Sequence, residues 1–201
     1  MRNPKTRNKH NQSRTTKNRS ASQLRIIGGQ YRGRKLSFES AQGLRPTLDQ
    51  VRETLFNWLM NRVPNARCLD LFAGSGAIGF EALSRGAAEV TFVDNNLNSI
   101  NNINKNIQLL NNSKAQCAHQ SSNLFIESCH QQFDLVFLDP PYELNFIPTT
   151  LVNIQPILAK DALVYIEMEA DLSLDFLNDR WEVIKMKSSS RLSYGLIREK
   201  L

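Results

Sequence analysis

Apolar residues along this chain fall into two alternating patterns, short continuous runs and longer amphipathic stretches. The runs are β-branched or aromatic and lack a helical period, which is typical of buried parallel strands. The longer stretches repeat apolar residues every three or four positions, which predicts helices with one buried face. Predicted strands cover residues 68–72, 90–94, 115–118, 133–138 and 162–168, and predicted helices cover 48–59, 77–84, 97–110 and 124–129.

Two more apolar stretches, at 181–186 and 192–198, flank a serine-rich turn at 188–190 and predict an antiparallel pair. Strands that alternate with helices indicate an α/β fold, a doubly wound parallel sheet with right-handed crossovers. Residues 64–201 are expected to form this sheet domain, and no run within them is long enough to span a membrane.

The N-terminal part differs from the sheet domain in both pattern and charge. Residues 1–22 contain almost nothing apolar and are expected to form a basic, disordered tail. Residues 23–63 are expected to form an extension in which a glycine-containing β-hairpin precedes the first helix. The tail is either a solubilising segment or an arm that contacts phosphates.

Basic charge is concentrated in these N-terminal segments. The net charge is +6, and the first 38 residues hold 11 of the 25 lysines and arginines and no acidic residue. A basic arm on an acidic body predicts a polyanionic partner, and an interleaved tyrosine suits a stacked RNA base. For Arg45 and Arg52, near the start of the first predicted helix, the alternative to RNA binding is a solvent-exposed helix face with salt bridges. The candidate RNA-binding residues are Arg25, Tyr31, Arg32, Arg34, Lys35, Arg45 and Arg52.

Cysteine and histidine are few and scattered. The three cysteines form no CxxC pair and the three histidines do not cluster, so neither a zinc site nor a disulfide framework is expected. The N-terminus has no apolar signal segment. We expect a monomer in the reducing cytoplasm, with no metal and no membrane partner.

The predicted strand at 133–138 leads into Asp139-Pro140-Pro141-Tyr142. Two prolines stop both a helix and a strand ladder, so the backbone leaves the sheet at the edge where α/β folds bind ligands. Asp139 supplies a carboxylate, Pro140 a carbonyl, and Tyr142 an aromatic face. Together they could accept hydrogen bonds from an amine while a flat ring stacks on Tyr142. The alternative is an ordinary strand-terminating turn.

A glycine-rich loop follows the first predicted strand of the sheet. Gly74 and Gly76 allow the backbone to approach a ligand closely, and Gly79 allows tight packing of helix on strand. Asp94, at the end of the next strand, could accept both hydroxyls of a ribose. These residues are compatible with binding either a dinucleotide or S-adenosylmethionine.

Two features favour S-adenosylmethionine as the cofactor. Asp70 lies just before the glycines, where a carboxylate would orient a cationic amino-acid group and repel a pyrophosphate. The Asp-Pro-Pro-Tyr segment at 139–142 has no evident use in hydride transfer. A carboxylate that braces the loop is the alternative for Asp70.

The chain resembles the S-adenosylmethionine-dependent amino-methyltransferases in three sequence blocks and in their order. These blocks are residues 70–79, Asp94 and residues 139–142. That resemblance implies a Rossmann-like seven-stranded sheet with helices on both faces. Further blocks resemble the RsmD family of bacterial small-subunit rRNA methyltransferases, over a match that runs from about Leu24 to the C-terminus. These blocks are Arg25-Ile26-Ile27-Gly28-Gly29 through Gly33-Arg34, Arg45-Pro46-Thr47 and Val51-Arg52-Glu53.

The RsmD resemblance implies methylation of the exocyclic N(2) amine of one guanine, guanine 966 of 16S rRNA, in the small ribosomal subunit or its assembly intermediate. Related enzymes often carry Asp or Asn after the third strand to contact the adenine, where this chain has Ser121-Ser122-Asn123. The resemblance assigns catalysis to Asp139, Pro140, Pro141 and Tyr142, and cofactor binding to Asp70, Phe72, Gly74, Gly76, Asp94, Asn95, Ser122 and Asn123.

Three other functions share part of this pattern. A DNA adenine or cytosine amino-methyltransferase would use the same tetrad, but the chain has little room for a target-recognition domain. A nucleotide-dependent oxidoreductase would use the glycine loop and leave Tyr142 without a role. A non-catalytic ribosome-assembly factor would need only the basic arm and leave the cofactor pocket unexplained.

Overall fold

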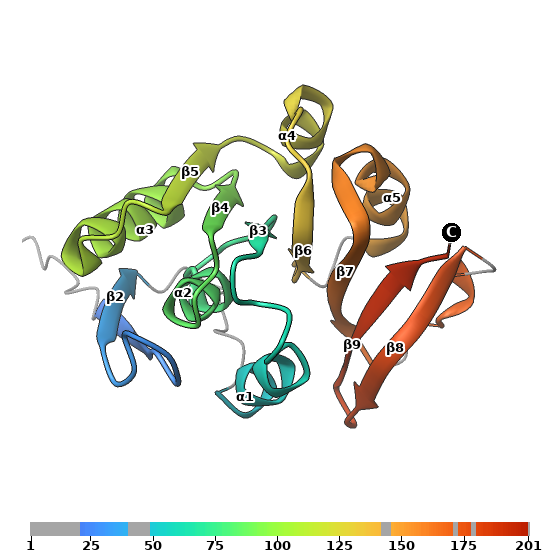
Figure 1. Cartoon of the computed structure of the whole chain (residues 1–201), viewed down its shortest axis with the longest axis horizontal. Helices are drawn as coiled ribbons and strands as arrows, with labels where there is room; N and C mark the ends of the chain where they lie inside the picture. The colour runs from blue at the N-terminus through green and yellow to red at the C-terminus, as the bar shows by residue number, and fades with distance from the viewer. Residues whose placement is uncertain (1–20, 40–48, 142–145, 171–172, 178–179, 201) are drawn as a thin grey trace, which may run out of the picture.

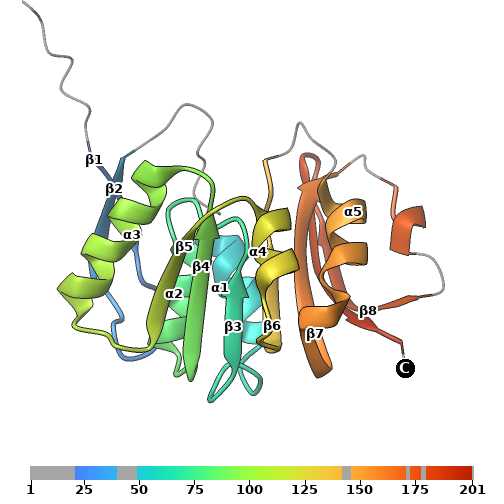
Figure 2. The ribbon, with the colours of Figure 1, turned by 90° about the horizontal axis from the view of Figure 1, so that it is seen from above.

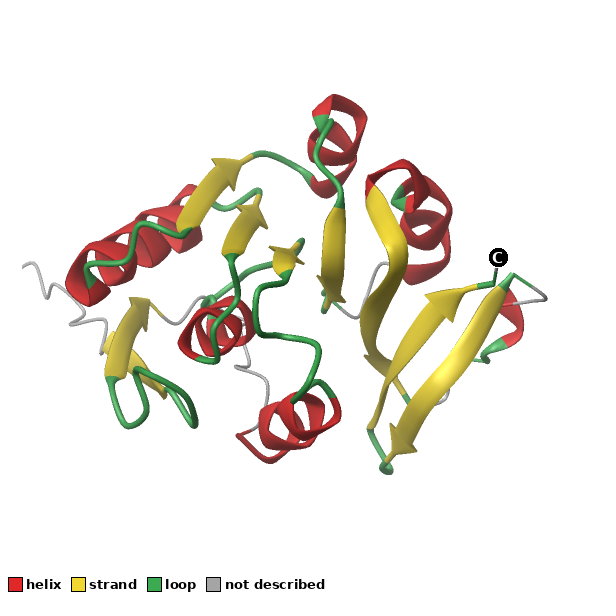
Figure 3. Cartoon of the chain, in the orientation of Figure 1, coloured by secondary structure: helices red, strands yellow, loops and turns green. Residues whose placement is uncertain are grey.

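The computed structural model describes residues 21–39, 49–141, 146–170, 173–177 and 180–200. Within these residues, one seven-stranded sheet is flanked by helices, and a separate two-stranded sheet precedes it (Figure 3). The strands are β1 (Ala21–Arg25), β2 (Lys35–Glu39), β3 (Arg67–Asp70), β4 (Glu89–Asp94), β5 (Ala115–His119), β6 (Phe133–Leu138), β7 (Leu158–Glu169), β8 (Trp181–Ser188) and β9 (Leu192–Glu199). The helices are α1 (Asp49–Trp58), α2 (Ala77–Ser84), α3 (Leu97–Leu110), α4 (Ser122–Ser128) and α5 (Phe146–Asn153), with 3-10 turns at Gln155–Ile157 and Asp175–Leu177.

The order of strands in the large sheet is β5-β4-β3-β6-β7-β9-β8. Strands β3 to β7 run parallel, whereas β9 runs antiparallel between β7 and β8. The predicted seven-stranded α/β sheet is therefore confirmed. So is the antiparallel pair at its C-terminal end, because β8 and β9 join at the serine-rich turn.

Most predicted elements agree with the structure within a few residues, and α2, α3 and β6 agree at both ends. Helix α4 begins two residues before the predicted start, because the Ser121 side chain accepts a hydrogen bond from Leu124 N and caps it. Strand β7 begins at Leu158 rather than at residue 162. The pattern assigned no element to the residues that form α5.

The two faces of the sheet bury separate apolar cores. One core combines the hairpin, α1, α2 and α3 with the sheet, and the other combines α4 and α5 with it. Figure 1 shows the hairpin, α1 and α2 on one side of the sheet and α4 and α5 on the other. Among the described helices, none has the length and apolarity that crossing a membrane requires.

Helix α2 is buried on all sides, between the sheet and the N-terminal hairpin. Gly79 brings the helix close to β4, because a Cβ atom built there would lie 2.2 Å from the Phe92 ring. This confirms the predicted role of Gly79 in packing. On the outer side, β1 and β2 form the predicted antiparallel hairpin, which lies beside α3 in Figure 2.

The loop after β1 docks on α2 through its backbone. Glu81 Oε2 accepts from Ile27 N and Oε1 accepts from Gly28 N, both at 2.8 Å. Gly29 has a φ of +74°, and a Cβ atom there would lie 1.9 Å from the carbonyl oxygen of Ser84. Glycines at this point therefore permit a close approach between two backbones.

Candidate active site

Acidic residues meet where parallel strands end at one edge of the sheet. Asp70 on β3, which lies between β4 and β6, is opposite Phe92 of β4 and Phe137 of β6. Asp94 and Asp139 follow these two phenylalanines by two residues each. Three carboxyl groups that are far apart in the sequence therefore lie at neighbouring strand ends.

Asp94 shapes the glycine loop that the sequence predicts to hold the cofactor. Its Oδ2 accepts from Gly74 N and its Oδ1 from Asn96 N, both at 2.7 Å. Gly76 has a φ of +78° and precedes α2, in a conformation that favours glycine. Each carboxylate oxygen can accept a second hydrogen bond, so this arrangement is compatible with a ribose on Asp94.

Asp70 is buried, and its Oδ2 accepts from Gly79 N at 3.0 Å, in the first turn of α2. This contact is the loop-bracing role that competes with the predicted role in cofactor binding. Burial raises the pKa of Asp70 from 3.8 to about 7; the hydrogen bond from Gly79 N opposes this shift, and the charge of Asp94 adds a smaller increase. A bound cation beside Asp70 would lower that pKa again, so the two roles are compatible.

We expect the free energy of unfolding to fall as the pH rises from about 4 to about 7, through the contribution of Asp70. In this range the folded chain retains a proton on Asp70 that the unfolded chain has lost, so raising the pH favours the unfolded chain. Asp70→Asn should remove this part of the pH dependence. Urea titrations at several pH values measure it, and an unchanged profile in the variant would contradict the assignment.

The remaining predicted cofactor residues lie around the same edge. Phe72 is half-buried and packs against Phe146 of α5 at a ring distance of 5.9 Å. Asn95 is exposed directly after β4. Ser122 and Asn123 lie in the first turn of α4, whose cap is Ser121. The hydroxyl of Ser121 accepts from Leu124 N at 3.4 Å, and the predicted adenine contact through Ser122 or Asn123 stays a prediction.

The predicted catalytic segment begins where β6 ends. Asp139 is half-buried, Pro140 is buried and Pro141 is exposed, so the backbone leaves the sheet as the two prolines predict. Tyr142 lies outside the described residues. Asp139 and the carbonyl of Pro140 remain the predicted acceptors for an amine.

The sequence pattern did not predict two buried polar side chains that lie beside Asp139. Tyr165 and Glu167 lie on β7, and the Tyr165 hydroxyl donates to Glu167 Oε2 at 2.7 Å. Both are buried. A single acid inside the apolar run at 162–168 was the available signal, because unpaired acids are rarely buried.

Four of the predicted RNA-binding residues form an exposed basic surface on the hairpin. Arg25 on β1 pairs directly with Lys35 on β2, and both point away from the core that their neighbours Leu24 and Leu36 enter. Like charges placed opposite one another destabilise a hairpin unless an anion lies nearby. Arg32 and Arg34, in the connecting loop, complete the surface.

The structure contradicts the predicted RNA contact of Arg52 and favours a different role for Tyr31. Arg52 is 1% exposed and donates to Arg25 O at 2.9 Å and to Asp49 at 2.6 Å, so it joins α1 to the hairpin rather than facing RNA. The buried face of α1 is wider than its apolar pattern suggests, because α1 contacts both sheet and hairpin. Tyr31 packs against the core and accepts from Asn112 at 3.0 Å, which favours anchoring over base stacking. Arg45 lies outside the described residues.

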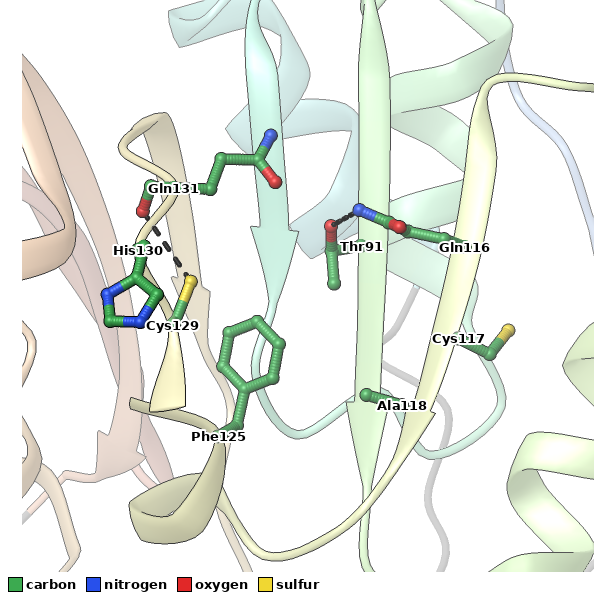
Figure 4. A pocket seen from close by; sticks show the side chains of 8 residues that line it. All are labelled: Thr91, Gln116, Cys117, Ala118, Phe125, Cys129, His130 and Gln131. Atoms are coloured by element: carbon green, nitrogen blue, oxygen red, sulfur yellow. Dashed lines mark hydrogen bonds between the residues drawn. The ribbon is translucent and has the colours of Figure 1, made fainter. Parts of the chain in front are cut away.

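A pocket of about 250 Å³ lies on the α4 side of β4 and β5 (Figure 4). Thr91, Phe125, Cys129 and His130 line it, and none of the predicted site residues does. In Figure 4, Cys117 points away from Cys129.

Among the described residues, no three His, Cys, Asp or Glu side chains are grouped as a metal site would require.

The strand order of the large sheet is that of the S-adenosylmethionine-dependent methyltransferases, and the glycine loop and the three acids lie at the edge of the sheet where the sequence predicts the cofactor. Residues 24–198 match the family described as "Conserved hypothetical protein 95". The chain belongs to this family, the RsmD family, which confirms the resemblance found in the sequence.

Individual relatives agree with this family assignment. The chain is 43% identical over 180 residues to "Ribosomal RNA small subunit methyltransferase D" of Haemophilus influenzae, covering 87% of this chain and 93% of that one. The solved structure of Escherichia coli yhhF has a TM-score of 0.82 at 38% identity and covers 89% of this chain and 99% of that one. The protein SMU.776, solved in complex with SAH, has a TM-score of 0.68 at 15% identity over 82% of this chain and 53% of that one, which shows the fold alone.

Proposed function

We propose that this protein transfers a methyl group from S-adenosylmethionine to the exocyclic N(2) amine of one guanine in 16S rRNA, within the small ribosomal subunit or its assembly intermediate. The observation that carries the proposal is the meeting of the Asp94-braced glycine loop with Asp139 and Pro140 at one sheet edge. The RsmD family membership and the name of the Haemophilus influenzae relative support rRNA as the substrate. The reaction would take place in the cytoplasm.

The charge of the site fits the proposed cofactor. Asp70 and Asp94 lie close enough for the charge of Asp94 to raise the pKa of Asp70, so the edge attracts cations. S-adenosylmethionine carries a sulfonium and an ammonium group, whereas a dinucleotide would bring a pyrophosphate into the same field. The cofactor supplies an electrophilic methyl group on sulfur.

The protein's contribution is to prepare the amine. An exocyclic amine is a poor nucleophile, because its lone pair is delocalised into the ring. Acceptors at Asp139 and the Pro140 carbonyl would hold both N–H bonds, favour a pyramidal nitrogen and stabilise its developing positive charge. The proton that the amine loses on methylation would leave to Asp139 or to water. The base would have to be unstacked to reach this edge, and Tyr142 is the proposed stacking partner.

The test is methyl transfer from labelled S-adenosylmethionine to small subunits that lack the modification, with naked 16S rRNA and DNA alongside. Label on the N(2) amine of a single guanine is the expected result. Label on adenine or cytosine in DNA would contradict rRNA as the substrate but would support methyl transfer to an exocyclic amine. Cofactor binding without transfer to any of them would overturn the function as a whole.

We expect the double variant Arg25→Ala, Lys35→Ala to raise the KM for small subunits about tenfold and to leave cofactor binding unchanged. Both side chains are exposed on one face of the hairpin. Losing two phosphate contacts should also reduce the slope of log affinity against log salt by about 2. The matched control is Gln23→Ala, a neutral exposed residue on the same strand. An unchanged slope of log affinity against log salt would show that Arg25 and Lys35 do not contact RNA phosphates.

A further inference from the structure

Glu167 is a buried carboxyl group on β7, two residues before the end of the strand and one strand away from Asp139. Its exposed fraction is 4%. Strands β6 and β7 run parallel with Leu138 opposite Ile166, so Asp139 and Glu167 are the next residues along two adjacent strands. Adjacent strands lie about 4.8 Å apart. Glu167 is therefore a neighbour of the proposed amine acceptor.

Tyr165 holds this carboxyl group in place. Its hydroxyl donates to Glu167 Oε2 at 2.7 Å, and its ring is fully buried beside Phe137. Burial, followed by the charges of Glu167 and Asp139, raises the pKa of Tyr165 well above its usual value. The phenol therefore remains a donor at neutral pH. Asp139 is one of these charges, as its place beside Glu167 in the register of β6 and β7 leads one to expect.

The other side of Glu167 is also rigid. It pairs with Tyr194 of β9, whose ring stacks on Trp58 of α1 at 5.6 Å. Glu167 is thus a fixed acceptor on a packed strand rather than a flexible surface side chain.

The edge of guanine offers a matching set of donors. Its N(2) amine has two hydrogens and the adjacent ring nitrogen N1 has one, whereas adenine and cytosine place an unprotonated nitrogen beside their amine. If Asp139 and the Pro140 carbonyl accept the two amine hydrogens, N1–H is the next donor along the edge. We infer that Glu167, held by Tyr165, accepts N1–H of the target base and thereby selects guanine. This inference rests on the proposed function.

A base with an acceptor at that ring nitrogen would place two acceptors face to face in a buried site. A site built to receive a substrate hydrogen bond rejects an analogue without the donor by about 10⁴-fold. Such discrimination separates guanine from adenine and cytosine, whose amines the Asp-Pro-Pro-Tyr segment alone could also accept. Glu167 is therefore a specificity-determining residue in this proposal.

The test uses small subunits reconstituted from 16S rRNA that carries either guanine or 2,6-diaminopurine at the target position. Diaminopurine keeps the N(2) amine and replaces N1–H by an acceptor. The unmodified enzyme should prefer guanine by about 10⁴-fold in kcat/KM. Glu167→Gln places an amide that can donate to N1, so the preference should shrink by at least about 100-fold, mainly through faster reaction of diaminopurine. A purely structural role would lower both rates together and overturn the inference.

Two further variants keep the test decisive. Tyr165→Phe preserves the packing and removes the hydroxyl that orients Glu167, so the guanine preference should fall by at least about tenfold. An unchanged preference in this variant would overturn the inference, even if Glu167→Gln did not fold. Glu182→Gln, exposed on β8 and paired with Arg198, should leave the preference unchanged. If the unmodified enzyme methylates no guanine, the proposed function fails. If it methylates guanine and diaminopurine equally, only the role of Glu167 fails.

Discussion

Replacing Asp139 by alanine is expected to reduce turnover about 10³-fold while changing cofactor affinity by no more than about threefold. Removing one preorganised group that stabilises developing charge costs roughly this much in other enzymes. Asp139 lies at the end of β6, whereas the glycine loop that would hold the cofactor is braced by Asp94 from β4. Cofactor binding and amine activation are therefore separable. Methyl incorporation and calorimetric binding of S-adenosylmethionine measure the two effects.

The comparison with Asp139→Asn sharpens this prediction. Asparagine keeps an acceptor oxygen and removes the charge, so this variant should retain more activity than the alanine variant if accepting the amine hydrogen is the main role. Asp175→Ala, an exposed acid outside the strand ends, is the control and should be fully active. Equal loss of turnover and cofactor binding in a folded Asp139→Ala protein would contradict the assignment.

Glu81→Ala is expected to lower the free energy of unfolding by about 3–5 kcal/mol, because it removes one partner from a buried charged network. Glu81 is fully buried and accepts from Ile27 N, Gly28 N and Arg85 Nε at 2.7–2.8 Å. Without it, two backbone donors and a guanidinium lose their acceptor. Urea unfolding measures the stability of the variant.

The same variant should also release the hairpin from α2. Trypsin should then cleave after Arg25 and Arg32 at lower concentrations than it does in the unmodified protein. Glu127→Ala, which removes an exposed glutamate from α4, is the control and should change stability by less than about 0.5 kcal/mol. A Glu81→Ala protein of unchanged stability and protease resistance would show that the hairpin is held mainly by its apolar contacts.

The sequence by itself determined the order and type of most elements and the position of the glycine loop between β3 and α2. Strand and helix periods are local properties, so α2, α3 and β6 could be predicted to the residue. Glycine and proline also act locally: Gly79 and Gly29 allow close approaches, and Pro140 lies two residues after Leu138, where β6 ends. Such residues restrict the backbone wherever the chain places them.

Only the tertiary structure decided which polar residues are available to a ligand. Arg52 was predicted to contact RNA and is instead buried between α1 and the hairpin, because its environment depends on two elements distant in sequence. Glu81 and Glu167 are each a single acid in an apolar stretch, and their partners lie on other segments or emerge only from strand register. Periodicity describes one element at a time, whereas burial and hydrogen bonding depend on how elements meet. The position of Glu167 beside Asp139 follows from the pairing of β6 with β7, and that pairing is a property of the folded sheet.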